Sequence, residues 1–152
     1  MDKLHLRDLM VVITLTAVAV VYQILFTLPI IEQYGLEVPQ IIKFHSFEML
    51  IVVVVLAPIV EEICFRLFPL LIANGRERKS SVVGIAIASS VIFTLGHGLL
   101  WSVLIAIMPF SLLLFSVGWW YSKKDLWRRA VIVCVAIHGL NNLALTLYIA
   151  HT

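Results

Sequence analysis

The sequence has few charged residues. Lys, Arg, Asp and Glu make up 13% of its 152 residues, whereas a soluble domain carries about 25%. The formal net charge of +2 is too small to suggest a nucleic-acid-binding surface. Hydrophobic residues instead make up 62% of the chain, against about 45–50% in soluble domains. These departures exclude an ordinary soluble domain and a disordered or low-complexity protein, and they indicate a polytopic membrane protein.

Cysteine is also scarce, and nothing indicates a segment that is removed after targeting. Cys64 and Cys134 are the two cysteines, and both lie inside hydrophobic runs, which argues against a disulfide framework. The first hydrophobic run has no charge and no small-residue cleavage site near its end, so it does not resemble a signal peptide. No internal repeat or Gly/Ser-rich linker divides the chain. We therefore expect one membrane-embedded domain over residues 1–152.

Hydrophobic runs long enough to cross a bilayer dominate what remains. A helix needs about 20 apolar residues to span the hydrocarbon core, and lipid offers no hydrogen-bond partners to an open strand. Five runs meet this requirement, at about residues 9–31, 47–73, 82–99, 101–121 and 126–150. The predicted fold class is all-α, a polytopic membrane helical bundle with about five transmembrane helices. Pro58 cannot donate a backbone hydrogen bond, so it should distort the second helix just before Glu61.

The basic residues predict the orientation of these helices. If the N-terminus is cytoplasmic, nine of the 11 Lys and Arg residues fall on the cytoplasmic side. They are Lys3, Arg7, Arg76, Arg78, Lys79, Lys123, Lys124, Arg128 and Arg129. Lys43 then lies outside, and Arg66 lies within a span. We predict an integral multi-pass protein, in a prokaryotic plasma membrane, with a cytoplasmic N-terminus and an extracytoplasmic C-terminus.

Several polar residues lie inside the hydrophobic runs. They are Glu61, Glu62 and Arg66 in the second run, His97 in the third, and His138 and Asn142 in the fifth. A charged side chain at the centre of a membrane helix is unfavourable by about 2.5–3.5 kcal/mol on insertion scales. Such residues usually face one another inside a bundle and carry function. We therefore predict a functional site at membrane depth.

Helical spacing sorts these residues by face. Glu62 and Arg66 are four residues apart, so an ion pair between them is expected. His138 and Asn142 share a face for the same reason. Glu61 lies about 100° around the helix from Glu62 and can therefore face a different neighbour.

Three motifs in this set resemble one protease family. The segment APIVEEICFR at residues 57–66 resembles an EExxxR motif, FTLGH at 93–97 an FxxxH motif, and HGLNN at 138–142 an HxxxN motif. Together, in this order and on separate spans, they resemble the CAAX-protease and bacteriocin-processing family of intramembrane proteases, which includes the CAAX prenyl protease 2-like enzymes. The resemblance covers about residues 47–150, the expected catalytic core.

The resemblance implies an intramembrane endopeptidase and a role for each residue. It implies that Glu61 is the general base and that His97 assists it in activating water. It implies that His138 and Asn142 stabilise the oxyanion, while the Glu–Arg pair of the first motif acts as a supporting salt bridge. Amide hydrolysis requires such a base and such donors. We expect Glu61, His97, His138 and Asn142 to converge on one polar, water-accessible site inside the bilayer.

The metal requirement stays open at this level. Glu61, His97 and His138 could form a His₂Glu zinc site with one open position. Members of the resembled family have been described both as metalloproteases and as glutamate-type proteases. The chain has no HExxH pair, and Asn142 suits an oxyanion role at least as well as metal binding. We favour water activation without a metal or other cofactor, with Zn²⁺ as the alternative.

Other functions are compatible with parts of this pattern. A non-catalytic bacteriocin-immunity protein would act by binding, although the complete residue set argues against it. A haem carrier could use His97 and His138 as axial ligands, and buried carboxylates could conduct protons. The resemblance implies membrane-associated peptide or protein substrates, among them prenylated C-terminal tails, bacteriocin or pheromone precursors and C-terminal sorting tails. Expected partners are thus the lipid bilayer and a peptide or protein substrate, with no nucleic acid.

Overall fold

Helices form all the regular secondary structure of the part of the chain that the computed structural model describes. The described residues are 6–33, 47–74, 79–97, 101–124 and 126–151. The elements are α1 (Leu6–Tyr22), η1 (Gln23–Thr27), α2 (Leu28–Gln33), α3 (Phe47–Ile51), η3 (Val52–Leu56), α4 (Ala57–Glu62), η4 (Ile63–Leu67), α5 (Phe68–Asn74), α6 (Lys79–Leu95), α7 (Trp101–Ser122) and α8 (Trp127–His151). The elements labelled η are π-helical turns within longer helices. The prediction of an all-α helical bundle is confirmed.

The helical segments follow the predicted hydrophobic runs closely, and the third differs most. Its helix begins at Lys79 and ends at Leu95, whereas the predicted run was 82–99. The chain then leaves the helix in a turn in which Gly96 N–H donates to the Ile92 carbonyl at 3.1 Å. Glycine at this point is a poor helix former, which explains the earlier end. Residues 98–100, the rest of the predicted run, lie outside the described residues.

Length and composition qualify two of the described helices as membrane spans. They are Leu6–Ile30, which crosses the α1–α2 boundary, and Trp127–Tyr148 in α8. Lys79–Leu95 and Ala106–Ser122 are apolar but shorter. The count of about five transmembrane helices therefore stays a prediction.

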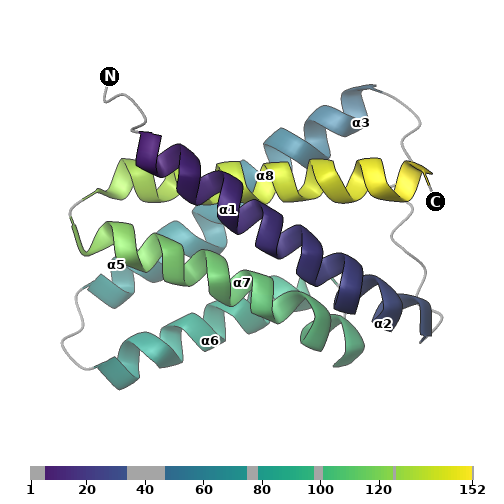
Figure 1. Cartoon of the computed structure of the whole chain (residues 1–152). Coiled ribbons are helices and arrows are strands. Elements are labelled where there is room, and N and C mark those ends of the chain that lie inside the picture. The colour runs from purple at the N-terminus through teal and green to yellow at the C-terminus, as the bar shows by residue number, and fades with distance from the viewer. Residues whose placement is uncertain (1–5, 34–46, 75–78, 98–100, 125, 152) are drawn as a thin grey trace.

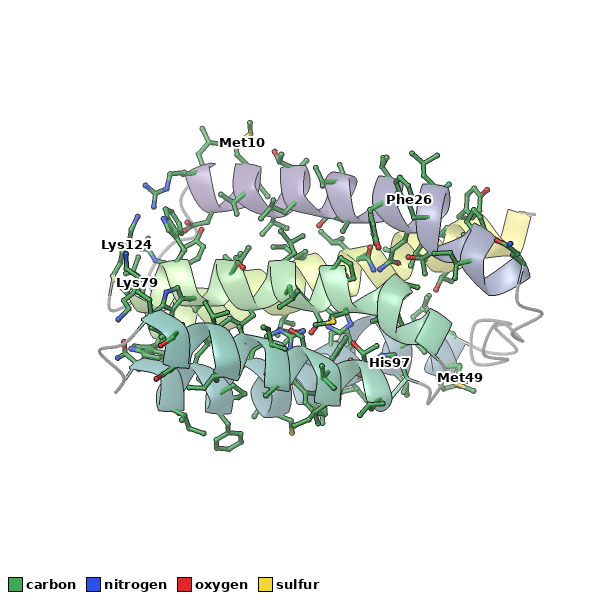
Figure 2. The ribbon with its side chains drawn as sticks, turned by 90° about the horizontal axis from the view of Figure 1, so that it is seen from below. Met10, Phe26, Met49, Lys79, His97 and Lys124 are labelled. Carbon is green, nitrogen blue, oxygen red and sulfur yellow. The ribbon has the colours of Figure 1, made fainter. Side chains whose placement is uncertain are left out.

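The helices run back and forth between two ends of the bundle (Figure 1). The start of α1, the end of α5, the start of α6, the end of α7 and the start of α8 lie at one end, and the ends of α2 and α8 lie at the other. Figure 2 shows Lys79 and Lys124 at the first end and Met49 at the second. We call the first end the basic end. Its described cations are Arg7, Lys79, Lys123, Lys124, Arg128 and Arg129.

Gathering of these cations at one end is what the predicted topology requires. Four further cations in the orientation argument, Lys3, Lys43, Arg76 and Arg78, lie outside the described residues. Which side of the membrane the basic end faces stays a prediction from the positive-inside rule.

Hydrophobic packing joins α1, α7 and α8 into one core. Val12 and Ala19 of α1 are buried against a cluster that includes Leu114 of α7 and Ile137 of α8. A second cluster packs Leu70 of α5 against α6 and α7. These contacts hold α8 at the centre of the bundle, where it can present side chains to the α3–α5 segment.

Prolines interrupt the regular helix at three places. Each π-helical turn ends two residues before a proline: Gln23–Thr27 before Pro29, Val52–Leu56 before Pro58, and Ile63–Leu67 before Pro69. Proline has no N–H, and its ring crowds the carbonyl four residues earlier, so the helix widens locally. The predicted distortion before Glu61 is confirmed by the turn that precedes Pro58.

Candidate active site

Three separate helices bring one carboxylate and two imidazoles together. Glu61 lies on α4, His97 in the turn after α6, and His138 on α8. The Glu61 Oε2 atom lies 3.8 Å from His97 Nε2 and 3.5 Å from His138 Nε2. Both separations exceed an ordinary hydrogen bond, so each atom can still bind a further partner such as water. The predicted convergence of these three residues is therefore present in the structure.

Hydrogen bonds to the other ring nitrogen orient both histidines. His97 Nδ1 lies 2.9 Å from the Phe93 carbonyl, and His138 Nδ1 lies 2.9 Å from Glu62 Oε1. A carbonyl can only accept, so His97 Nδ1 carries the proton in that contact. The partner of one nitrogen determines what the other can do. Both rings consequently turn Nε2 toward the Glu61 carboxylate.

Glu62 and Arg66 form the predicted ion pair beneath this site. Arg66 Nε lies 3.6 Å from Glu62 Oε2, and the two side chains are 2% and 1% exposed. The other Glu62 oxygen binds His138, a contact between residues 76 positions apart. Helical spacing predicted the ion pair, but no local signal indicated the bond to His138.

The Arg66 guanidinium makes further contacts that the sequence did not reveal. Its Nη2 donates to Ser111 Oγ at 2.7 Å, and its Nη1 donates to the Phe65 carbonyl at 2.9 Å. Its Cζ atom lies 4.7 Å from the centre of the Phe93 ring, a cation–π contact. Serine is common in apolar helices, so Ser111 carried no distinguishing signal. The cation is thus held on several sides by α6, α7 and its own helix.

The Phe65 carbonyl can accept from Arg66 because a proline follows it in the same helix. In a regular helix, the Phe65 carbonyl would accept from residue 69, which is Pro69 and has no N–H. Ser89 Oγ of α6 donates to this carbonyl alongside Arg66. The proline therefore creates the acceptor that ties the α4–α5 segment to α6 next to the site.

Asn142 binds a second backbone carbonyl that a proline leaves without its usual helical donor. Its Nδ2 donates to the Val53 carbonyl at 3.0 Å. The N–H of Ala57 is used by Val52, and Pro58 has none, so the π-helical turn leaves the Val53 carbonyl free. The amide nitrogen retains a second hydrogen. Among the described residues, the Asn142 amide makes no hydrogen bond to Glu61 or His97, so its predicted place in the site stays a prediction.

The three site residues differ in accessibility. Glu61 and His97 are 25% and 35% exposed, whereas His138 is 3% exposed. Phe93 and Phe110 pack against the His138 ring with centroid separations of 5.8 and 5.5 Å. A substrate can therefore reach Glu61 and His97 first, and His138 lies buried behind them.

The described residues contain no group of three His, Cys, Asp or Glu side chains placed to hold a metal ion. The zinc ligands that the sequence suggested, Glu61, His97 and His138, are among these described residues. The metal requirement stays a prediction, and no chemical step below is assigned to a metal.

A comparison with protein families gives a match that covers most of the chain, including the candidate site. The family model for the Rce1-like type II CAAX prenyl endopeptidases matches residues 43–144. The match includes all three sequence motifs, and therefore Glu61, His97 and His138. No curated protein and no solved structure matches the chain.

Proposed function

The chain belongs to the Rce1-like family of type II CAAX prenyl endopeptidases, and we propose that in this membrane protease Glu61 and His97 act directly on the hydrolytic water. Membership in the family makes the chain a membrane-integral CAAX protease that acts on membrane-embedded peptide or protein substrates. The single observation that supports the proposed chemistry is the convergence of Glu61 Oε2 on two imidazole Nε2 atoms.

The first step is attack by water on the scissile carbonyl carbon. A water beside Glu61 and His97 can donate one hydrogen to Glu61 Oε2 and the other to the His97 Nε2 lone pair. As its oxygen bonds to the carbonyl carbon, its proton passes to Glu61. A positioned base of this kind contributes about 10²–10⁴-fold to a rate.

The second step is collapse of the tetrahedral intermediate. The carbon–nitrogen bond breaks as the proton on Glu61 passes to the departing amine nitrogen. The negative charge that forms on the carbonyl oxygen needs donors, and we assign these to His138 Nε2–H and the second N–H of Asn142. Loss of one such donor typically lowers a rate by about 10²–10³-fold.

Glu62 supports this chemistry without touching the substrate. Its Oε1 accepts the Nδ1–H of His138, and its Oε2 faces Arg66. In that arrangement Nε2 of His138 faces Glu61, the position from which it can donate to the oxyanion. We therefore assign Glu62 and Arg66 as positioning residues.

Membrane-peptide profiling tests the proposed function. Cells carrying the wild-type chain should release peptides that mass spectrometry does not detect with the Glu61→Gln variant. Glu48→Gln makes the same chemical change near the start of the same helical segment, away from the site, and should leave the peptides unchanged. Identical profiles for the wild-type chain and the Glu61→Gln variant, both folded, would refute the protease mechanism and favour a binding role.

Chelation tests the absence of a metal step. Purified protein treated to complete metal removal should retain its cleavage rate, and elemental analysis should show no stoichiometric zinc. Loss of activity that zinc alone restores would replace the proposed mechanism with a metalloprotease one. The same result would assign Glu61, His97 and His138 as ligands.

A further inference from the structure

Arg66 and Glu62 lie side by side without a direct hydrogen bond. The Arg66 Nε and Glu62 Oε2 atoms are 3.6 Å apart, and among the described residues each of these buried atoms has no hydrogen-bond partner. An arginine usually closes on a carboxylate to about 2.7–2.9 Å, often through two parallel hydrogen bonds. Charge attraction draws the guanidinium toward Glu62, so other contacts must keep it at the longer distance.

The hydrogen bonds of the Arg66 guanidinium supply this restraint. Its Nη1 donates to the Phe65 carbonyl, which belongs to the preceding residue of the same helix and moves with it. Its Nη2 donates at 2.7 Å to the hydroxyl of Ser111, a buried residue of α7. Helix α7 carries none of the three sequence motifs. Because the Ser111 bond is directed to a different helix, it fixes the guanidinium relative to the rest of the bundle.

The position of Arg66 decides how the Glu62 carboxylate is shared. Glu62 Oε1 accepts from His138 Nδ1 at 2.9 Å, and this bond turns His138 Nε2 toward Glu61 Oε2, 3.5 Å away. A guanidinium that closed on Glu62 through two parallel bonds would occupy both carboxylate oxygens. The carboxylate would then turn away from His138, and the imidazole would lose the partner that orients it.

We propose that Ser111 is a further positioning residue for the cleavage reaction, which holds the Arg66 guanidinium back so that Glu62 stays bonded to His138. Ser111 acts through Arg66 and Glu62 and touches neither the substrate nor the hydrolytic water. The inference rests on the proposed function for its effect on cleavage. Its effect on the His138 ring rests on the contacts alone.

Two substitutions of nearly equal shape isolate the hydroxyl of Ser111. Ser111→Thr keeps the hydroxyl and Ser111→Val lacks it, so any crowding at this buried position is common to both. Per folded molecule, kcat of Ser111→Val should be lower than that of Ser111→Thr by at least about 10-fold, because a misplacement of about 1 Å can lower a rate by about 10²-fold. KM should be equal in the two variants. The same two substitutions at Ser116, an exposed residue of α7, should change neither constant.

Nuclear magnetic resonance of the full chain in detergent, with isotope-labelled histidine, gives a measurement that does not depend on cleavage. A histidine Nδ1–H bonded to a carboxylate resonates at low field, and the His138→Gln variant identifies the His138 signal by its loss. The signal should persist in Ser111→Thr and should be lost or shifted in Ser111→Val. Ser111→Ala, which adds no bulk, should behave as Ser111→Val does.

Each outcome supports or overturns the inference. A lower kcat together with the changed His138 signal supports it. Equal kcat in Ser111→Val and Ser111→Thr, an unchanged signal in Ser111→Val, or unfolding of both Ser111→Val and Ser111→Ala would each overturn it. A failure of the proposed function appears differently, as peptide profiles that do not depend on Glu61, and the His138 signal would still test the role of Ser111.

Discussion

At the scale of single residues, two adjacent carboxylates have different surroundings. Glu61 faces His97 and His138 and is one-quarter exposed, whereas Glu62 is buried between Arg66 and His138. Neighbouring residues on a helix point about 100° apart, so one can face the reaction while the other faces the core. This difference predicts different consequences of the same substitution.

Glu62→Gln should reduce both folding and activity. Removing one member of a buried ion pair leaves an uncompensated charge on Arg66, typically a loss of about 3–5 kcal/mol in the free energy of unfolding. Glu61→Gln should instead leave the protein folded and inactive. Thermal unfolding in detergent, measured beside cleavage, distinguishes the two variants. Equal loss of folded protein in both would contradict this division of roles.

Asn142→Ala should lower stability and the cleavage rate by separate mechanisms. The partly buried Val53 carbonyl loses its donor, and a group left unsatisfied in this way is unfavourable by up to about 1–3 kcal/mol. Loss of an oxyanion donor should also reduce the rate of the remaining folded protein by about 10²–10³-fold. The rate is measured per folded molecule below the melting temperature. An unchanged rate would restrict Asn142 to holding the helices together.

At the scale of helices, prolines and π-helical turns supply the contacts that join neighbouring elements. The Val53 and Phe65 carbonyls, released from their own helix, accept from Asn142 of α8 and Ser89 of α6. The Val54 carbonyl, which precedes Pro58 by four residues, lies where a Cβ on Gly139 of α8 would have to fit. The distorted helix is therefore held by polar and close backbone contacts on both sides of Glu61.

Gly139→Ala should push α8 away from this helix. The added Cβ would lie 2.5 Å from the Val54 carbonyl oxygen, which is backbone and cannot rotate aside. Overpacking of this kind destabilises by about 1–3 kcal/mol and should move His138, the preceding residue, away from Glu61. Both the melting temperature and the cleavage rate should fall.

Gly84→Ala is the matched control for that variant. No atom lies within 4 Å of a Cβ at this helical position, and alanine favours a helix over glycine by about 1 kcal/mol. This variant should be as stable as the wild type or more so, and fully active. If both glycine variants changed the melting temperature and the cleavage rate equally, the close approach of α8 at Gly139 would not explain the effect of Gly139→Ala.

At the scale of the whole molecule, the first helix belongs to the same bundle as the site, although the family match begins only at residue 43. Tyr121 donates to Asp8 at 2.7 Å, and Asn141 donates to Gln23 at 3.3 Å. These buried contacts join the α1–η1 helix to α7 and α8 at two levels. The N-terminal helix therefore stabilises α8, the helix that carries His138.

Tyr121→Phe should weaken this attachment while sparing the chemistry. Hydrogen bonds to charged groups contribute about 1.5–3 kcal/mol, so the free energy of unfolding should fall by that order. Cleavage below the melting temperature should persist, because Tyr121 lies at the basic end. Ser116→Ala removes a hydrogen bond that an exposed hydroxyl makes within α7 and should change stability by less than about 0.5 kcal/mol. Equal stability of both variants and the wild type would show that the Asp8 contact contributes nothing.

The sequence by itself determined the features that depend on local spacing. Hydrophobic runs of membrane length predicted the helices, because lipid forces the backbone to satisfy its own hydrogen bonds. A separation of four residues predicted the ion pair of Glu62 with Arg66, because side chains one turn apart share a face. The three motifs indicated the family and the residues of the candidate site, because each motif is short and continuous.

Only the tertiary structure decided how the helices meet. The bond from Glu62 to His138, the contacts of Ser111, and the side on which Glu61 is exposed all depend on the relative height and rotation of separate helices. Hydropathy cannot specify these, because lipid tails are as apolar as the side chains that pack between helices, and small residues and polar contacts set the packing instead. Here Gly139 and the carbonyls released by prolines supply those contacts, and their partners lie dozens of residues away in the chain.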